Sequence, residues 1–264
     1  MRDARLRREK VSLAMTSDPD RVPVVSTSNP KLRLVRRLQS ASQRERLGLF
    51  VCEGEDLIVA GMEAGLEPEE LLVDAARPTL EERVPRATFI ASELMGVLSE
   101  LAHPARAIAV FRRAGLPRLD PTQLAETGLA LWRVSDPGNV GGLLRSADAL
   151  GSGYVCLSAG CADPTGSKAL RASMGAVFRV PLGEFEQAPG RRVGLVAHGG
   201  VPLAEVDLSG PVCFVLGAER EGLPDDVAAG CDELATIPLA GRAESLNVGI
   251  AGALALYERR RRAG

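Results

Sequence analysis

The sequence predicts an α/β protein in which a small leading α/β unit precedes a larger unit with a parallel sheet. Five short apolar segments between residues 128 and 239 are bounded by Gly, Pro or Asp, and stretches with helical spacing separate them. Continuous apolar strands of this kind are typical of parallel sheets covered by helices on both faces. Upstream, between residues 24 and 112, shorter strands and helices alternate. Both parts of the chain therefore belong to the α/β class.

The leading unit begins with a predicted helix over residues 31–46. Leu32, Leu34 and Leu38 give this stretch an apolar stripe at rough helical spacing, which leaves its arginines together on one face. The elements expected after it are a strand at 47–54, a helix at 55–64, strands at 70–74 and 87–91, a helix at 92–101 and a strand at 107–112.

The larger unit follows a stretch that contains two prolines and no clear periodicity. A nearly apolar run from Val248 to Tyr257 predicts its last helix. Its expected strands lie at 128–134, 153–158, 192–198, 211–217 and 233–239. The predicted organisation is a disordered basic tail (1–22), a substrate-binding domain (23–113), a linker (114–124) and a catalytic domain (125–264).

Composition narrows the class of protein. Hydrophobic residues make up 45% and charged residues 25% of the 264 positions, as is ordinary for a soluble globular chain. No apolar run reaches the roughly 20 residues that span a bilayer, and the charged first residues do not form a secretory signal. Five cysteines at irregular spacing favour reduced thiols in the cytoplasm over disulfides or a zinc site. The two histidines are too few and too far apart to suggest a metal cluster. We expect a cytoplasmic protein with no metal and no membrane partner.

Charge is distributed unevenly along the chain. The net charge is −2, but residues 1–48 contain twelve Lys or Arg and only five Asp or Glu. A basic leading segment is a local signature of phosphate binding, as in nucleic-acid recognition. Arg36 and Arg37, on the helix predicted at 31–46, are the candidate RNA contacts. The alternative is that these residues form only a solvated tail and helix face.

Three expected strands end in a Gly-rich polar segment that enters a helix. In parallel α/β sheets ligands bind at the carboxyl ends of strands, so these segments should meet at one edge. They contribute Asn139, Arg145, Glu219, Ser245 and Asn247. Four of these five residues also have an ordinary structural interpretation: a turn for Asn139, a surface ion pair for Arg145 and helix capping for Glu219 and Ser245.

Further motifs near this edge carry less weight. Lys168 and Arg171 read best as a solvated helix face, and the Gly-Ser-Lys before them lacks the order of a P-loop. No G-x-G-x-x-G fingerprint is present, so a nicotinamide-dependent oxidoreductase has little support.

Three motifs together resemble the SpoU/TrmH family of RNA ribose 2′-O-methyltransferases, within the SPOUT superfamily. They are DPGNVGGLLRSADALG (136–151), FVLGAEREGLP (214–224) and IPLAGRAESLNVGIAGAL (237–254), in the family's order. Segments 167–182 and 29–58 are also similar, so the resemblance covers roughly residues 25–260.

The resemblance implies a specific architecture and cofactor. The catalytic domain would be a SPOUT fold with a deep trefoil knot, preceded by a small ribosomal-protein-like RNA-binding domain. S-adenosylmethionine would bind in the knot against the main chain of Gly217, Ile237 and Leu246. Relatives are homodimers with the active site close to the subunit interface, so a homodimer is expected here.

The resemblance also assigns roles to the polar residues. Arg145 would face the reacting 2′-hydroxyl and the adjacent phosphate, while Asn139, Ser245 and Asn247 orient the substrate and Glu219 fixes the network. Family proposals make this arginine a general base, but a guanidinium stays protonated, so a role as an electrostatic clamp is chemically easier. The expected substrate is ribosomal RNA. The alternatives are transfer RNA, or a catalytically silent RNA-binding protein of the same fold.

Overall fold

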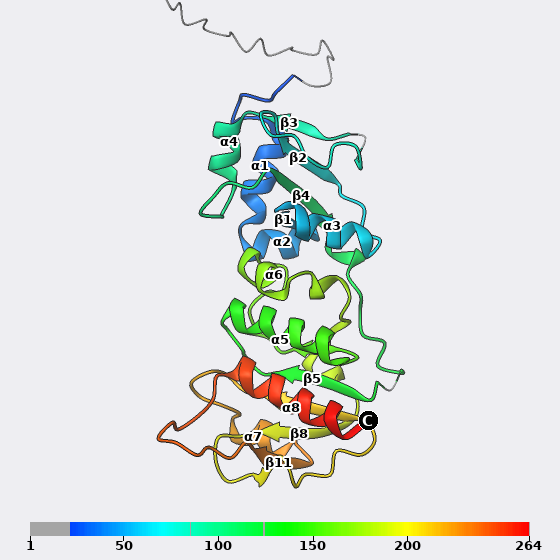
Figure 1. Cartoon of the computed structure of the whole chain (residues 1–264), viewed down its shortest axis with the longest axis vertical. Helices are drawn as coiled ribbons and strands as arrows, with labels where there is room; N and C mark the ends of the chain where they lie inside the picture. Colours follow the sequence, from blue (N-terminus) through cyan, green and yellow to red (C-terminus); the bar gives the residue numbers. More distant parts are fainter. Residues whose placement is uncertain (1–21, 85, 124, 264) are drawn as a thin grey trace, which may run out of the picture.

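Two β-sheets follow one another along the chain and along the long axis of the molecule (Figure 1). The protein, seen here as a computed structural model, is described over residues 22–84, 86–123 and 125–263. The expected basic tail at 1–22 therefore lies outside the described residues, except for Val22. Within the described ranges, every helix is too short or too polar to cross a membrane.

The upstream sheet has four strands and mixed direction. It contains β1 (Leu49–Glu53), β2 (Glu70–Asp74), β3 (Thr88–Ile90) and β4 (Ala107–Arg112), in the spatial order β1-β4-β2-β3. β4 pairs antiparallel with β1 and β2, whereas β2 and β3 run parallel. The helices of this unit are α1 (Pro30–Leu38), α2 (Ala41–Leu47), α3 (Glu55–Glu63) and α4 (Ser92–Leu98). Leu32 of α1 and Met95 of α4 pack in one cluster with Ile108, so these two helices cover one face.

The single helix predicted at 31–46 is wrong, because the chain forms two helices with a break at Gln39 and Ser40. The Arg44 side chain is buried and donates hydrogen bonds to the carbonyl oxygens of Leu38 and Gln39, both at 2.9 Å. These bonds satisfy carbonyl groups at the end of α1 that would otherwise need a continuing helix. Hydrophobic spacing carries no signal for such a side-chain cap.

The downstream sheet has seven strands, and every pairing in it is parallel. The strands are β5 (Thr127–Leu131), β6 (Val155–Leu157), β7 (Leu182–Glu184), β8 (Arg191–Leu195), β9 (Val201–Pro202), β10 (Val212–Leu216) and β11 (Glu233–Thr236), in the order β7-β6-β5-β10-β8-β11-β9. All five predicted strands are present. The sequence prediction missed β7 and β9, which are short edge strands.

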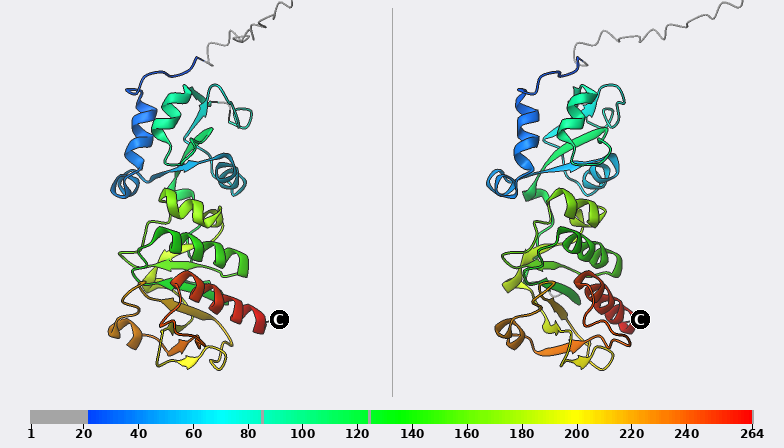
Figure 2. Two further views of the ribbon diagram at one scale, coloured as in Figure 1. Left: turned by 60° about the vertical axis from the view of Figure 1, so that its left-hand side comes forward. Right: turned by 90° about the vertical axis from the view of Figure 1, so that its left-hand side faces the viewer.

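Helices cover this sheet and connect its strands. They are α5 (Pro137–Leu150), α6 (Ser167–Ser173), α7 (Asp225–Ala229) and α8 (Val248–Ala263), with 3₁₀ turns η2 (Arg113–Gly115), η3 (Ala176–Phe178) and η4 (Phe185–Gln187). α8 begins where the apolar run predicted it and continues to Ala263. α5 packs between α6 and α8 (Figure 2). A Cβ on Gly141 would lie 2.3 Å from the Ala169 carbonyl oxygen, so only glycine permits this close approach of α5 and α6.

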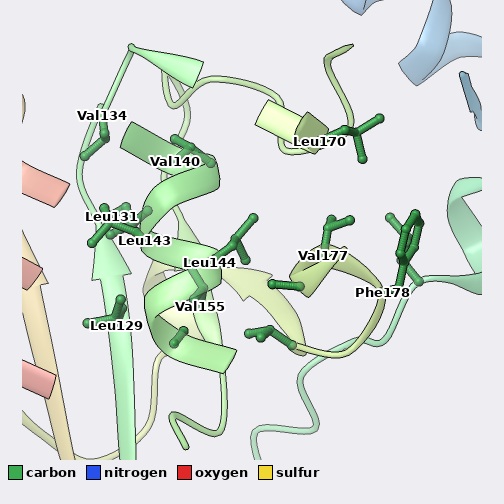
Figure 3. Packing of buried hydrophobic residues seen from close by; sticks show 14 of the residues in the cluster. Leu129, Leu131, Val134, Val140, Leu143, Leu144, Val155, Leu170, Val177 and Phe178 are labelled. Carbon is green, nitrogen blue, oxygen red and sulfur yellow. The ribbon is translucent and has the colours of Figure 1, made fainter. Parts of the chain in front are cut away.

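The hydrophobic core continues from the downstream sheet into the upstream one. Leu143 and Leu144 of α5 pack near Leu129 and Leu131 of β5, and Leu170 and Phe178 extend the cluster away from the sheet (Figure 3). The ring centroid of Phe178 lies 6.4 Å from those of Phe50 and Phe111 in the upstream sheet. An ion pair between Arg44 and Asp163, at 2.8 Å, lies in the same interface. The two sheets therefore share buried contacts, and the boundaries predicted at 113 and 125 stay predictions.

Candidate active site

Three loops at the carboxyl edge of the downstream sheet meet through one chain of side-chain hydrogen bonds. Asn247, just before α8, donates from Nδ2 to Oδ1 of Asn139 at 3.1 Å. Asn139, in the first turn of α5, donates from Nδ2 to Oε1 of Glu219 at 3.0 Å. Glu219 follows β10 by three residues. Three of the five predicted polar residues are thus brought together, and we call Asn139, Glu219 and Asn247 the polar trio.

Glu219 also binds the backbone that leads into α5. Its carboxylate accepts hydrogen bonds from the N–H groups of Asp136, at 3.0 Å, and Ser135, at 3.3 Å. Burial by itself would raise the pKa of Glu219, but the hydrogen bonds from Asn139 and from these backbone groups hold it below the ordinary value. The Glu219 side chain is therefore a stable anion that fixes the position of the β5–α5 loop.

The start of α5 is held by a second carboxylate that the motif analysis did not single out. Asp136 caps the helix, because its Oδ1 accepts from the Asn139 N–H at 3.0 Å. Its Oδ2 pairs with Lys168 of α6 at 2.8 Å, and this bond and the one from Asn139 lower the pKa of Asp136. An Asp-Pro before a helix is a recognisable capping signal. Lys168 and Arg171 are exposed, as the solvated-face interpretation expected.

The N-cap of α8 is Asn247, and the expectation that Ser245 fills this position is wrong. The Asn247 Oδ1 accepts from the N–H groups of Gly249, at 2.9 Å, and Ile250, at 3.2 Å. Ser245 lies two residues earlier, is exposed and lines a cavity instead. Asn247 thus caps α8 through its side-chain oxygen and donates a hydrogen bond to Asn139 through its side-chain nitrogen.

A cavity of about 330 Å³ lies directly beside the polar trio. Its walls come from residues 195–197 at the end of β8, from residues 216–223 at the end of β10, and from six residues between 237 and 251 around the start of α8. They include Gly217, Glu219, Ile237, Ser245 and Leu246. A volume of this size is within the range of small-molecule and cofactor sites. The three residues predicted to contact the cofactor all lie on its wall.

The cavity is shaped by a tight loop after β10. Ala218 and Gly222 exchange backbone hydrogen bonds of 3.1 and 2.9 Å, which folds the loop back on the strand end. A Cβ on Gly217 would lie 2.1 Å from the carbonyl carbon of Gly222, so a side chain at this position is excluded. The cavity thus combines apolar side chains, close backbone groups and the polar side chains of Glu219 and Ser245, which fits the adenosine and methionine parts of S-adenosylmethionine.

Arg145 is not part of the polar trio. It is exposed on α5, six residues beyond Asn139, which corresponds to a rise of about 9 Å along the helix. Its guanidinium has no hydrogen-bond or ion-pair partner among the described residues. Within one chain the structure therefore leaves this side chain free for a ligand.

The predicted RNA contacts lie on the surface of α1. Arg36 is half-buried and Arg37 is exposed. Arg37 and Arg46 of α2 both donate to Oε1 of Gln43, at 3.3 and 2.6 Å, so Gln43 gathers two cations on one surface. The sequence analysis did not single out Arg46, because the break after α1 was not foreseen. No group of acidic, His or Cys side chains suited to a metal ion occurs in the parts of the chain that the structure describes.

Fold and site together define a parallel α/β protein with a cofactor-sized cavity and a polar cluster at one sheet edge. The SpoU rRNA Methylase family model matches residues 126–257. An uncharacterized tRNA/rRNA methyltransferase of Synechocystis is 30% identical over 260 residues, covering 92% of this chain and 94% of its own. The 23S rRNA (guanosine(2553)-2′-O)-methyltransferase RlmP of Bacillus subtilis is 29% identical and covers 90% and 98%.

Solved structures agree with these sequence matches. An AdoMet-bound rRNA methyltransferase from Sinorhizobium meliloti has a TM-score of 0.81 at 30% identity, over 91% of this chain and 98% of that one. The SpoU methyltransferase AviRb from Streptomyces viridochromogenes, in complex with AdoMet, has a TM-score of 0.78 at 28% identity, over 89% and 98%. The chain belongs to the SpoU rRNA methylase family. The expected family and α/β fold class are thereby confirmed.

Proposed function

We propose that this protein transfers the methyl group of S-adenosylmethionine to a ribose 2′-hydroxyl of ribosomal RNA. The observation that carries the proposal is the polar trio, assembled from three loops beside a cofactor-sized cavity. Two relatives support ribosomal RNA over transfer RNA by their names: RlmP, and a 23S rRNA (uridine(2479)-2′-O)-methyltransferase of Streptomyces viridochromogenes that is 30% identical over 84% of this chain.

The cavity residues suit the cofactor. Bound there, S-adenosylmethionine would supply a methyl carbon that the ribose 2′-oxygen can attack, with the thioether sulfur of S-adenosylhomocysteine as the leaving group. We assign the main chain of Gly217, Ile237 and Leu246 to the adenosyl part, because these residues line the cavity. We further propose that the segments around this cavity form the trefoil knot expected of the family.

The chain's own residues must place the 2′-oxygen and stabilise the negative charge that it gains as its proton leaves to water. Asn139, fixed between Asn247 and Glu219, can orient the ribose, and Ser245 can contact it from the cavity wall. Arg145 has free donors, and its charge would stabilise the forming alkoxide and hold the adjacent phosphate. Since a guanidinium is always protonated at neutral pH, we assign it an electrostatic role and not that of a base.

A second copy of the chain would complete the site. A shallow apolar groove between α5 and α8 is lined by Leu150, Ile250, Leu254 and Tyr257 and reaches Asn139 and Asn247. Ile250 is 54% and Tyr257 is 55% exposed, which is unusual for a contiguous apolar surface on a monomer. A homodimer that buries this groove would place the partner beside the polar trio. The five cysteines, all free, agree with a cytoplasmic location.

The test is methyl transfer with purified protein and labelled S-adenosylmethionine. Ribosomal RNA from cells that lack the gene should gain one label, at a ribose whose 3′ linkage becomes resistant to alkaline hydrolysis. Arg145→Ala should lower turnover at least about 100-fold, because it removes charge stabilisation of the alkoxide, while calorimetry shows unchanged cofactor binding. Substantial methylation by this variant would remove Arg145 from the mechanism. Label in transfer RNA instead would favour that substrate, and absent cofactor binding would favour a silent RNA-binding protein.

A further inference from the structure

Arg133 has a backbone conformation that few side chains adopt. It follows β5 by two residues and has a φ of 51°, in the left-handed region. The described chain contains two further non-glycine residues of this kind, Leu80 and Met174. Met174 ends α6 as its C-cap, and Leu80 packs against the hydrophobic core, so both have a structural reason. Arg133 is exposed and has neither reason.

The surrounding loops hold Arg133 in this conformation. Its N–H donates to Oγ of the buried Ser158 at 2.9 Å, and the next residue, Val134, accepts from the Ala162 N–H at 2.9 Å. The side chain then lies over Gly160, with its Nε 3.4 Å from the position that a Cβ there would occupy. Strain of this kind persists where the structure enforces it, and it concentrates at functional sites.

The guanidinium of Arg133 has no hydrogen-bond or ion-pair partner within the described ranges, in contrast to three cations that contact the loops on either side of it. Lys168 pairs with Asp136, and Arg44 and Arg113 pair with Asp163. The same loop that carries Gly160 carries Asp163, which binds Arg44 of α2. The loop at 158–166 therefore connects α2 with the end of β5, where the N–H of Ser135 binds Glu219.

We propose that Arg133 is a substrate-positioning residue that binds a phosphate of the RNA between the α1–α2 surface and the target ribose. The inference rests on the proposed function. The guanidinium of Arg133 is planar and always charged, and its backbone is held in one conformation. It is therefore suited to bind a phosphate at a fixed position. The arginines gathered by Gln43 at one end and the polar trio at the other end define the direction of the RNA strand across the loop at 158–166.

Arg133→Gly tests the proposal, because glycine accepts the left-handed backbone and removes only the side chain. We expect a melting temperature at or above that of wild type and unchanged cofactor affinity. KM for ribosomal RNA should rise about tenfold with kcat nearly unchanged, as for the loss of one charged hydrogen-bonded contact. The slope of log affinity against log salt should fall by about one. Arg133→Lys should keep the salt slope and recover part of the affinity.

Arg118→Gly is the matched control. Arg118 is exposed, and its guanidinium has no hydrogen-bond or ion-pair partner among the described residues. Its backbone forms a bridge with Leu182 at the amino end of β7, on the opposite edge of the sheet. This variant should keep wild-type KM and salt slope. The proposal would be overturned if Arg133→Gly kept the wild-type KM and salt slope. It would also be overturned if this variant had a lower melting temperature or a lower affinity for the cofactor. If the wild-type protein transfers no methyl group, the proposed function fails. The RNA affinities of wild type and Arg133→Gly, and their salt dependence, then still test whether Arg133 binds a phosphate.

Discussion

Asp74 and Glu219 are two carboxylates near strand ends that accept similar hydrogen bonds in opposite surroundings. Asp74 ends β2, is fully buried, and accepts from the Ala76 N–H, the Arg77 guanidinium and the Ser92 hydroxyl at 2.6–3.0 Å. Glu219 is exposed beside a cavity, and its partners lie 80 or more residues away in sequence. Hydrogen bonding alone therefore does not mark a functional carboxylate. A nearby cavity and partners from distant loops are what distinguish Glu219 as the candidate.

The largest expected difference between Glu219 and Asp74 is in their effect on turnover. Glu219→Ala should lower kcat/KM about 100-fold, because Asn139 and the Ser135–Asp136 backbone lose the anion that fixes them. The unfolding free energy should change by less than about 1 kcal/mol, since the side chain is exposed. The measurement is methyl transfer at saturating cofactor, with urea unfolding of the same samples.

A double-variant cycle gives the control for Glu219. If the polar trio acts as one unit, Glu219→Ala combined with Asn139→Ala should be scarcely slower than either single variant. Fully multiplicative losses would show that the two side chains contribute independently, which contradicts the network seen here.

The sequence predicted the parts of this site that depend on strand ends, and missed those that depend on side-chain caps. The strands β5 and β10, which position two of the three loops, were predictable because they are continuous buried runs, and β11 was predictable from the apolar residues that follow it up to Leu239. β7 and β9 have three and two residues of mostly intermediate exposure, so no pattern distinguishes them from loops. The break after α1 depends on Arg44 reaching back to two carbonyl groups, which is a tertiary contact.

The residues of the site divide in the same way. Motif order indicated that Asn139, Glu219 and Asn247 would converge, and they do. Whether Arg145 reaches the substrate depends on RNA or a second copy of the chain, and neither is encoded in the spacing along one chain. Which of Ser245 and Asn247 caps α8 depended on where the helix begins, to within two residues. Helix ends are the least certain part of any pattern-based prediction.

Asp74 should show the reverse behaviour to Glu219. Asp74→Ala should lower the unfolding free energy by about 2 kcal/mol, because it removes a buried carboxylate that accepts three hydrogen bonds, one of them from a guanidinium. Urea unfolding measures this loss, and methyl transfer per folded molecule at low temperature should stay near wild type. A loss of turnover as large as that of the Glu219 variant would show that the upstream sheet takes part in catalysis.

The pH dependence of stability distinguishes the role of Asp74 further. Burial would raise the pKa of Asp74, but hydrogen bonds from Ser92 and Arg77 hold it below the ordinary value of 3.8. A depressed pKa in the folded state gives stability that is complete above the unfolded-state pKa and is lost as the pH falls through the folded one. The stability difference between wild type and Asp74→Ala should therefore be constant near neutral pH and narrow below about pH 4. A difference that grows on acidification would contradict this sign.

The smallest expected effect separates the two functions of Asn247. Asn247→Ala removes a helix cap and should lower the unfolding free energy by about 1 kcal/mol, together with turnover. Asn247→Asp keeps an oxygen that caps α8 but loses the Nδ2 donor to Asn139, so it should be as stable as wild type and as slow as the alanine variant. Ser245→Ala should leave stability within about 0.5 kcal/mol, since Ser245 caps nothing. Wild-type turnover in Asn247→Asp would show that the hydrogen bond to Asn139 is dispensable for methyl transfer. Asn247 would then have a purely structural role, like Asp74.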